Sequence, residues 1–141
     1  MNRRVFAAAG LGLTLALGAC LTSNNPDPSL RTSTAVTGQV TRQDGSPVGG
    51  PLVAVRILGE VKNGTATVLG ESTVIADANG RVLFLFLISG EQPQNGTALV
   101  EVTPPIASAL LPVDTAGIPI KVSQGDVPSD TAYVQLVLPP R

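Results

Sequence analysis

Beyond residue 33 the sequence consists of short segments in which apolar and polar residues alternate, and this alternation restricts the chain to β-structure. In 34–41, for example, Val36 and Val40 alternate with Thr37 and Thr41. A period of two places every second side chain on the same face of a strand. Turn sequences rich in Gly, Pro and Asn separate the segments. We expect strands near 34–41, 52–58, 66–76, 82–88, 98–103, 118–122 and 132–138.

This pattern predicts an all-β fold, an immunoglobulin-like antiparallel β-sandwich of about seven strands over residues 34–141. The only helical candidate after the leader is 106–111, which is short and follows two prolines. A domain of this size buries about 65% of its unfolded surface, which is enough for stability without disulfides. Because the chain has one Cys and no Trp, the likeness to antibody domains concerns architecture only.

The first 19 residues have the organisation of an export signal. Arg3 and Arg4 precede an apolar stretch over 5–17, which is shorter than the roughly 20 residues of a membrane-spanning helix. The stretch ends in Leu17-Gly18-Ala19-Cys20, which resembles the lipobox of bacterial lipoproteins. The alternative is an ordinary secretory signal followed by a chance cysteine.

The lipobox resemblance implies cleavage between Ala19 and Cys20, a lipid thioether on Cys20 and usually acylation of the new amino terminus. Several acyl chains would anchor the protein stably in a membrane. The anchor would lie in the cell membrane or, in a Gram-negative bacterium, in the outer membrane, which Leu21 after the cysteine favours. Residues 20–33 would then form the lipidated Cys and a flexible tether, since polar residues and prolines dominate there.

Residue types that are missing or scarce exclude most enzyme chemistry. The chain has no His and a single Cys, so a Ser-His-Asp triad, a His-ligated zinc and, with Cys20 lipidated, a cysteine nucleophile are excluded. Without the leader, seven basic and ten acidic residues remain, and aromatic residues make up 3%. That composition argues against nucleic-acid binding. We expect a non-enzymatic protein without catalytic residues, metal or cofactor.

A few polar residues could still form sites. Asp44, Asp77 and Asn79 could bind calcium, although a turn is the favoured interpretation, and Asp126 with Asp130 could form an acidic patch or a solvated loop. Ser72, Ser89 and Ser108 lack a nearby base. An enzyme that used carboxylates alone would need two of Asp44, Asp77, Glu101, Asp114 and Asp126 to face each other across a cleft.

The segment 82–88 is apolar on both faces of the expected strand. The favoured interpretation is a central strand whose second face lies under a loop such as 104–117. The alternative is a face that binds a protein partner, or an edge that accepts an added strand. The candidate partner-binding residues are Leu83, Phe84, Leu85 and Phe86.

Two stretches carry a resemblance to known domain families. The sequence from Gly38 through the turn at 44–50 to Val55 resembles the opening of carboxypeptidase regulatory-like domains. Asp77-Ala78-Asn79-Gly80-Arg81 resembles a turn that those domains share with bacterial Ig-like modules of the intimin and invasin type. Both resemblances imply a β-sandwich, and neither implies an activity. Transthyretin-like hydrolases, which have a related sandwich, require histidines that this chain lacks.

These observations predict a membrane-anchored envelope lipoprotein whose Ig-like domain binds or scaffolds another envelope or surface component. Its expected partners are the membrane, through the lipid, and a protein of the envelope, with no nucleic acid. The alternative is a small-ligand or carbohydrate-binding module, which exposed aromatic residues would favour; the chain offers Tyr133 for that role.

Overall fold

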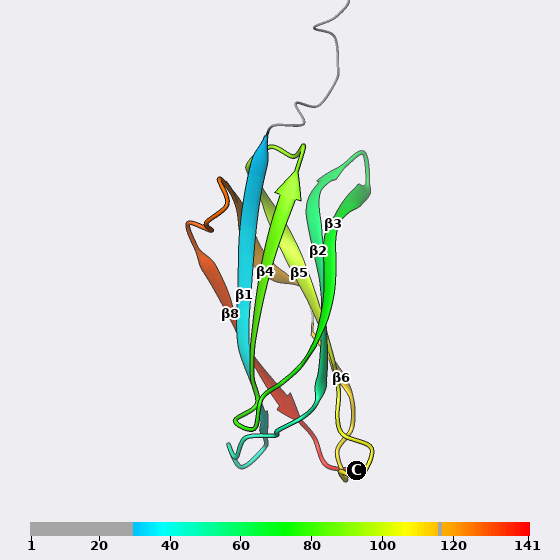
Figure 1. Cartoon of the computed structure of the whole chain (residues 1–141). Coiled ribbons are helices and arrows are strands. Elements are labelled where there is room, and N and C mark those ends of the chain that lie inside the picture. Colours follow the sequence, from blue (N-terminus) through cyan, green and yellow to red (C-terminus); the bar gives the residue numbers. More distant parts are fainter. Residues whose placement is uncertain (1–29, 116) are drawn as a thin grey trace, which may run out of the picture.

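A computed structural model describes residues 30–115 and 117–141, and all regular secondary structure in this part is β-strand (Figure 1). The predicted leader and lipidation site, including Ala19, Cys20 and Leu21, lie outside the described residues. The strands are β1 (Arg31–Arg42), β2 (Leu52–Lys62), β3 (Thr65–Ile75), β4 (Arg81–Ser89), β5 (Gln94–Thr103), β6 (Val113–Asp114), β7 (Ile118–Gln124) and β8 (Thr131–Leu138).

The eight strands of the described chain form one curled sheet in the order β3-β2-β5-β7-β1-β4 (Figure 1). The short β6 pairs with β5, and β8 pairs with β1. All pairs are antiparallel except β1 with β8, which run in parallel over eight registered residue pairs. β7 joins the two halves of the sheet, because 118–122 pair with β5 whereas Ser123 and Gln124 pair with β1. The turns between strands place Gly45, Gly64 and Gly80 at positive φ, which glycine adopts without steric strain.

The inward faces of both halves share one apolar core. Every second residue of each long strand points into it, which explains the alternation in the sequence. Phe84 and Phe86 of β4 stack there with ring centroids 6.2 Å apart. The other buried residues of the core are Val36, Val40, Val48, Val53, Val55, Ile57, Ala76, Val82, Ile88, Ala98, Val100, Val102, Leu110, Ile120, Val122, Val134, Leu136 and Leu138.

The predicted all-β class is confirmed. The finer assignment to an immunoglobulin-like sandwich stays a prediction, since β7 connects both halves into a continuous sheet. The helical candidate 106–111 contains no helix; Ser108 instead donates backbone and side-chain hydrogen bonds to the Pro105 oxygen.

β1 begins at Arg31, three residues before the predicted strand. Thr32, Ser33 and Thr34 are buried, although a run of polar residues in sequence indicates an exposed tether. In this part β1 is paired with β4 along one edge and, at Thr32 and Ser33, with β7 along the other, and the Ser123 hydroxyl binds the Ser33 oxygen.

Candidate functional site

β4 has one face in the core and one face in solvent. Phe84 and Phe86 are only 2% and 7% exposed, whereas Leu83, Leu85 and Leu87 are 67%, 56% and 59% exposed. The four residues predicted as a partner-binding face are therefore divided between the two sides of the strand. Only the leucines are accessible to a partner, and Leu83, Leu85 and Leu87 are called the leucine row below.

The expectation that this segment is a central strand is wrong. β4 lies at one end of the strand order and pairs only with β1. The exposure of the leucine row also shows that the loop 104–117 does not cover it. Two apolar faces in sequence suggested burial on both sides, but within residues 30–115 and 117–141 no second layer covers this outer face of the curled sheet.

Outward-facing residues of β1 and β8 continue the surface beside the leucine row. Leu83 and Leu85 lie opposite Thr37 and Ala35 of β1, and Thr37 in turn lies opposite Tyr133 of β8. Residues directly opposite one another in paired strands share a face. The exposed and half-exposed residues beside the middle of the row are uncharged: Thr37 of β1 and Thr131, Tyr133, Gln135 and Val137 of β8. Ser33 and Ala35 lie on the same side of β1 but are buried, and Arg31 and Arg81 place one charge at each end of the face.

Ala35 was not among the predicted site residues, and Tyr133 was named only for the alternative function of a small-ligand or carbohydrate-binding module. The alternation within 131–138 places Tyr133 on an outward face, and this is the signal that the sequence contains. Its position two strands from Leu83 follows from the parallel pairing of β8 with β1, which joins residues about 100 positions apart.

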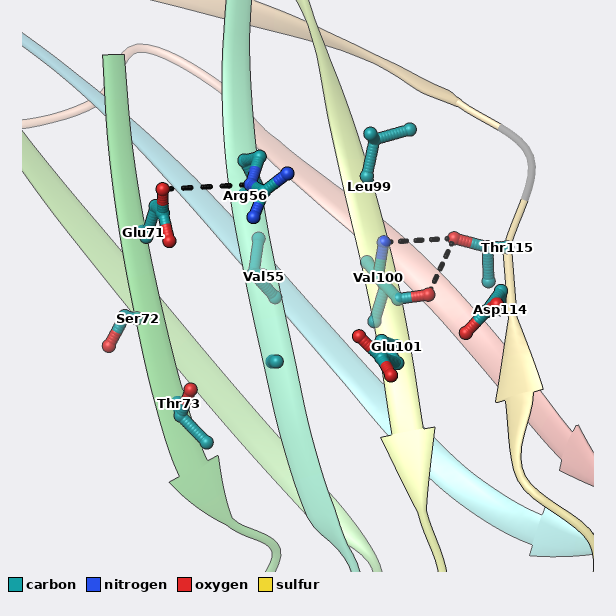
Figure 2. Close-up of a pocket in the computed structure, with 11 residues that line it drawn as sticks. Val55, Arg56, Glu71, Ser72, Thr73, Leu99, Val100, Glu101, Asp114 and Thr115 are labelled. Carbon is teal, nitrogen blue, oxygen red and sulfur yellow. Dashed lines mark hydrogen bonds and ion pairs between the residues drawn. The ribbon is translucent and has the colours of Figure 1, made fainter. Parts of the chain in front are cut away.

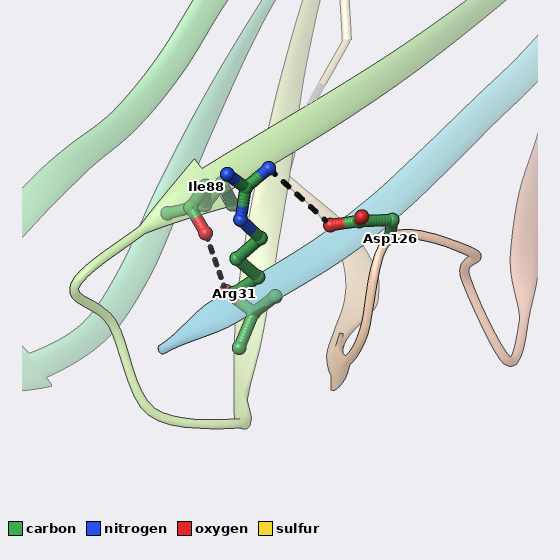
Figure 3. Close-up of polar contacts among 4 residues, drawn as sticks. Arg31, Ile88 and Asp126 are labelled. Carbon is green, nitrogen blue, oxygen red and sulfur yellow. Dashed lines mark hydrogen bonds and ion pairs between the residues drawn. The ribbon is translucent and has the colours of Figure 1, made fainter. Parts of the chain in front are cut away.

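Polar contacts gather at the end of this face where β1 begins. Arg31 lies 3.9 Å from an Asp126 carboxylate oxygen, and both side chains are exposed (Figure 3). The Ser123 hydroxyl donates to the Ser33 oxygen and accepts from the Ser129 N–H, so the loop after β7 is bound to β1. Asp126 and the neighbouring Asp130, whose carboxylate accepts the Thr131 N–H, thus serve local contacts.

The carboxylates of Asp44 and Asp77, which were considered as calcium ligands, accept hydrogen bonds within turns. One Asp77 carboxylate oxygen accepts the N–H groups of Asn79 and Arg81, each at 2.8 Å. One Asp44 oxygen accepts both the N–H and the hydroxyl of Ser46, at 2.9 and 2.6 Å. The bonds from Ser46 hold the pKa of Asp44 below its ordinary value, the hydroxyl bond contributing most. This use of both carboxylates favours the turn interpretation.

A second surface feature is an open hollow of about 280 Å³ on the outer side of β2, β3, β5 and β6 (Figure 2). Three acidic side chains and one arginine line it. Glu101 and Asp114 are register partners on β5 and β6, and Arg56 lies 3.6 Å from Glu71. The remaining lining residues are Ala54, Val55, Ser72, Thr73, Leu99, Val100 and Thr115.

Of the five carboxylates considered for an acid-base enzyme, the structure brings Glu101 and Asp114 together. Both are exposed at a hollow that is open to solvent, whereas catalytic carboxylates commonly lie in sites where burial and close partners tune them. Ser72 lines the same hollow, and Ser89 and Ser108 lie elsewhere, at the end of β4 and in the loop after β5. The arrangement suits attraction of a positively charged group.

Within residues 30–115 and 117–141, no helix has the length and apolar character that a membrane crossing requires.

No family model matches the chain, and no curated protein matches it. Solved structures whose backbone is similar in part include chlorocatechol 1,2-dioxygenase from Pseudomonas putida. The match has a TM-score of 0.49 and 10% sequence identity, and it covers 82% of this chain and 63% of that chain. The dioxygenase domain of a carbohydrate-binding fusion protein from Streptomyces sp. SirexAA-E has TM-score 0.43 and 12% identity, with 86% of each chain covered. An alternative pilotin from the type II secretion system of Vibrio cholerae has TM-score 0.42 and 14% identity, with 77% and 97% covered.

This chain spans less than two thirds of the chlorocatechol dioxygenase. At these identities and scores, none of the three structures assigns an activity to it.

Proposed function

We propose that the chain is a membrane-anchored, non-enzymatic envelope lipoprotein whose β-domain binds another envelope component through the outer face of β4, β1 and β8. The observation that carries the binding role is the leucine row, three large apolar side chains more than half exposed on one strand. The lipobox-like Leu17-Gly18-Ala19-Cys20 supports the anchor.

The energetics of this face suit protein binding. Full burial of a leucine side chain is worth about 1.5–3 kcal/mol, and each leucine of the row still exposes most of its surface. Because the exposed residues beside the middle of the row are uncharged and Arg31 and Arg81 lie only at its two ends, a partner could cover the leucines without desolvating an ion. Contiguous apolar surface of this kind marks interaction sites on soluble domains.

The test is in-cell crosslinking of the tagged protein, followed by membrane solubilisation and mass spectrometry. Leu85→Glu should remove the dominant crosslinked envelope protein, because a charge would be buried in the interface. Ile75→Glu is the matched control, since Ile75 is an equally apolar strand residue, 67% exposed, on β3. Phe84 is unsuitable for this purpose, because it lies in the core.

Equal crosslinking of wild type, Leu85→Glu and Ile75→Glu would contradict a binding role for the leucine row. A wild-type pattern no different from that of an unrelated lipidated domain would contradict the scaffold function itself.

A small-ligand function is the second candidate, and the hollow on β2, β3, β5 and β6 favours it. Its three carboxylates, of which only Glu71 has an arginine partner, would attract an organic cation. Sugar binding is less well supported, since the lining residues include no aromatic ring. An alkyl diamine should raise the Tm of the wild type and leave that of Glu101→Gln unchanged; no shift in either protein would refute this candidate.

A further inference from the structure

The two ends of the sheet differ in how they are protected against pairing with another strand. β3, at one end, carries Glu71 in an ion pair with Arg56 of β2. β4, at the other end, has seven consecutive apolar residues from Val82 to Ile88. Natural edge strands commonly carry charges or proline that prevent association. In the sheet that the structure describes, β4 has neither within this stretch.

Half of the backbone groups of β4 point away from the sheet. The Val82 and Ile88 carbonyl oxygens face β1, where they accept bonds of 3.0 and 3.4 Å from the hydroxyls of Thr37 and Thr32. The Gly90 N–H continues this side by donating to the Leu30 oxygen. The direction of these groups alternates from residue to residue along a strand. The N–H and C=O groups of Leu83, Leu85 and Leu87 therefore point away from β1, toward the free edge of the sheet.

β3 comes near β4 but does not pair with it. The approach is visible at Gly70 of β3, where an added Cβ would lie 2.9 Å from a ring carbon of Phe86. An inward-facing ring therefore fills the space between the two strands. The backbone groups on the free edge of β4 have no strand partner among the described residues.

We propose that β4 pairs edge to edge with β4 of a second copy of this chain, antiparallel about a two-fold axis through Leu85. This register places Leu83 of each copy opposite Leu87 of the other, and the two Leu85 side chains opposite each other. Leucines are thus matched with leucines at every outward position of 83–87.

The ends of the paired strands match as well. In this register Arg81 of each copy lies opposite Ser89 of the other. A polar pair therefore closes each end of the interface, as a two-fold axis requires. This self-complementary pattern of size and polarity along 81–89 is the reason to assign the edge to a second copy rather than to an unrelated strand.

The pairing would also join the leucine rows of the two copies into one apolar face of six leucines. It does not depend on the binding function proposed above, because the edge and the outward face use different groups: backbone N–H and C=O for the edge, side chains for the face.

The experiment is sedimentation analysis of the full chain, extracted from cells in detergent, at about 1 µM to about 1 mM protein. The wild type should reach twice the protein mass of one chain. Leu85→Arg should halve that mass, since the axis sets two like charges directly opposite each other. Ile75→Arg on β3 should remain a dimer, and circular dichroism should show that both variants are folded.

A second variant tests the register. In a Cys20→Ser background, Leu85→Cys should form a disulfide-linked dimer under mild oxidation. Leu52→Cys, at an exposed position of β2, should not form one. Monomers at all concentrations, a dimer that Leu85→Arg leaves intact, or equal linkage of both cysteine variants would overturn the pairing. A dimer that persists without crosslinks to other proteins would uphold the pairing and refute the proposed function.

Discussion

Replacing two adjacent residues of β4 by alanine should have very different effects on stability. Phe84 is 2% exposed and stacks on Phe86 in the core, whereas Leu85, the next residue, is 56% exposed. Loss of a buried phenylalanine side chain costs about 3–5 kcal/mol, because it removes transfer free energy and leaves a cavity. Since less than half of the Leu85 side chain is covered, Leu85→Ala should cost roughly 0.5–1.5 kcal/mol.

These values predict measurable and distinct transitions. Single domains have net stabilities of about 5–15 kcal/mol, so Phe84→Ala should remove a large part of the total. At about 4 °C per kcal/mol for a domain of this size, its Tm should fall by roughly 15 °C, and that of Leu85→Ala by roughly 4 °C.

Urea unfolding followed by far-ultraviolet circular dichroism is the suitable assay. The chain has no Trp and one Tyr, and Tyr133 is exposed on β8, so fluorescence would report little. The free energy of unfolding should differ between the variants while the denaturant slope stays constant. Equal losses for Phe84→Ala and Leu85→Ala, or a larger loss for Leu85→Ala, would refute the assignment of the two faces of β4.

Three further predictions concern turns, pH and the leader. In thermal unfolding, Gly80→Ala should lower the free energy of unfolding by roughly 1–3 kcal/mol more than Gly45→Ala. Both glycines have positive φ, but only at Gly80 would the new Cβ meet a carbonyl oxygen of β1. Equal losses of stability in the two variants would contradict this. The Asp44 carboxyl, followed by NMR, should titrate with a pKa below its ordinary value. Because its folded pKa is lowered, its contribution to stability is present at neutral pH and is lost as the pH falls through that pKa. An unshifted titration would refute the predicted effect of Ser46. Cys20→Ser should fail to incorporate labelled palmitate and should accumulate as precursor or appear without lipid, whereas membrane-bound protein of mature size would contradict lipidation.

Much of the strand content could be predicted from alternation alone. The segments 82–88 and 132–138 coincide with β4 and β8 within one residue at each end. The Asp77–Gly80 turn was likewise predictable, because an aspartate followed by Asn-Gly supplies both the hydrogen-bond acceptor and the positive φ. Local rules sufficed in these cases because the determining contacts lie within a few residues.

The candidate site could be predicted only in part. The sequence singled out 83–86, but choosing between the leucines and the phenylalanines required the position of the core. The two-residue β6, which brings Asp114 beside Glu101, shows too little periodicity to be predicted as a strand.

The sequence by itself determined that the chain forms β-strands, which side chains share a face, and that histidine and most cysteine chemistry is absent. Only the tertiary structure decided that β4 lies at the end of the sheet, that β8 runs parallel to β1, and that the leucines rather than the phenylalanines face solvent. The physical reason is that a period of two relates residues along one strand, whereas pairing and curling depend on contacts between residues far apart in the chain.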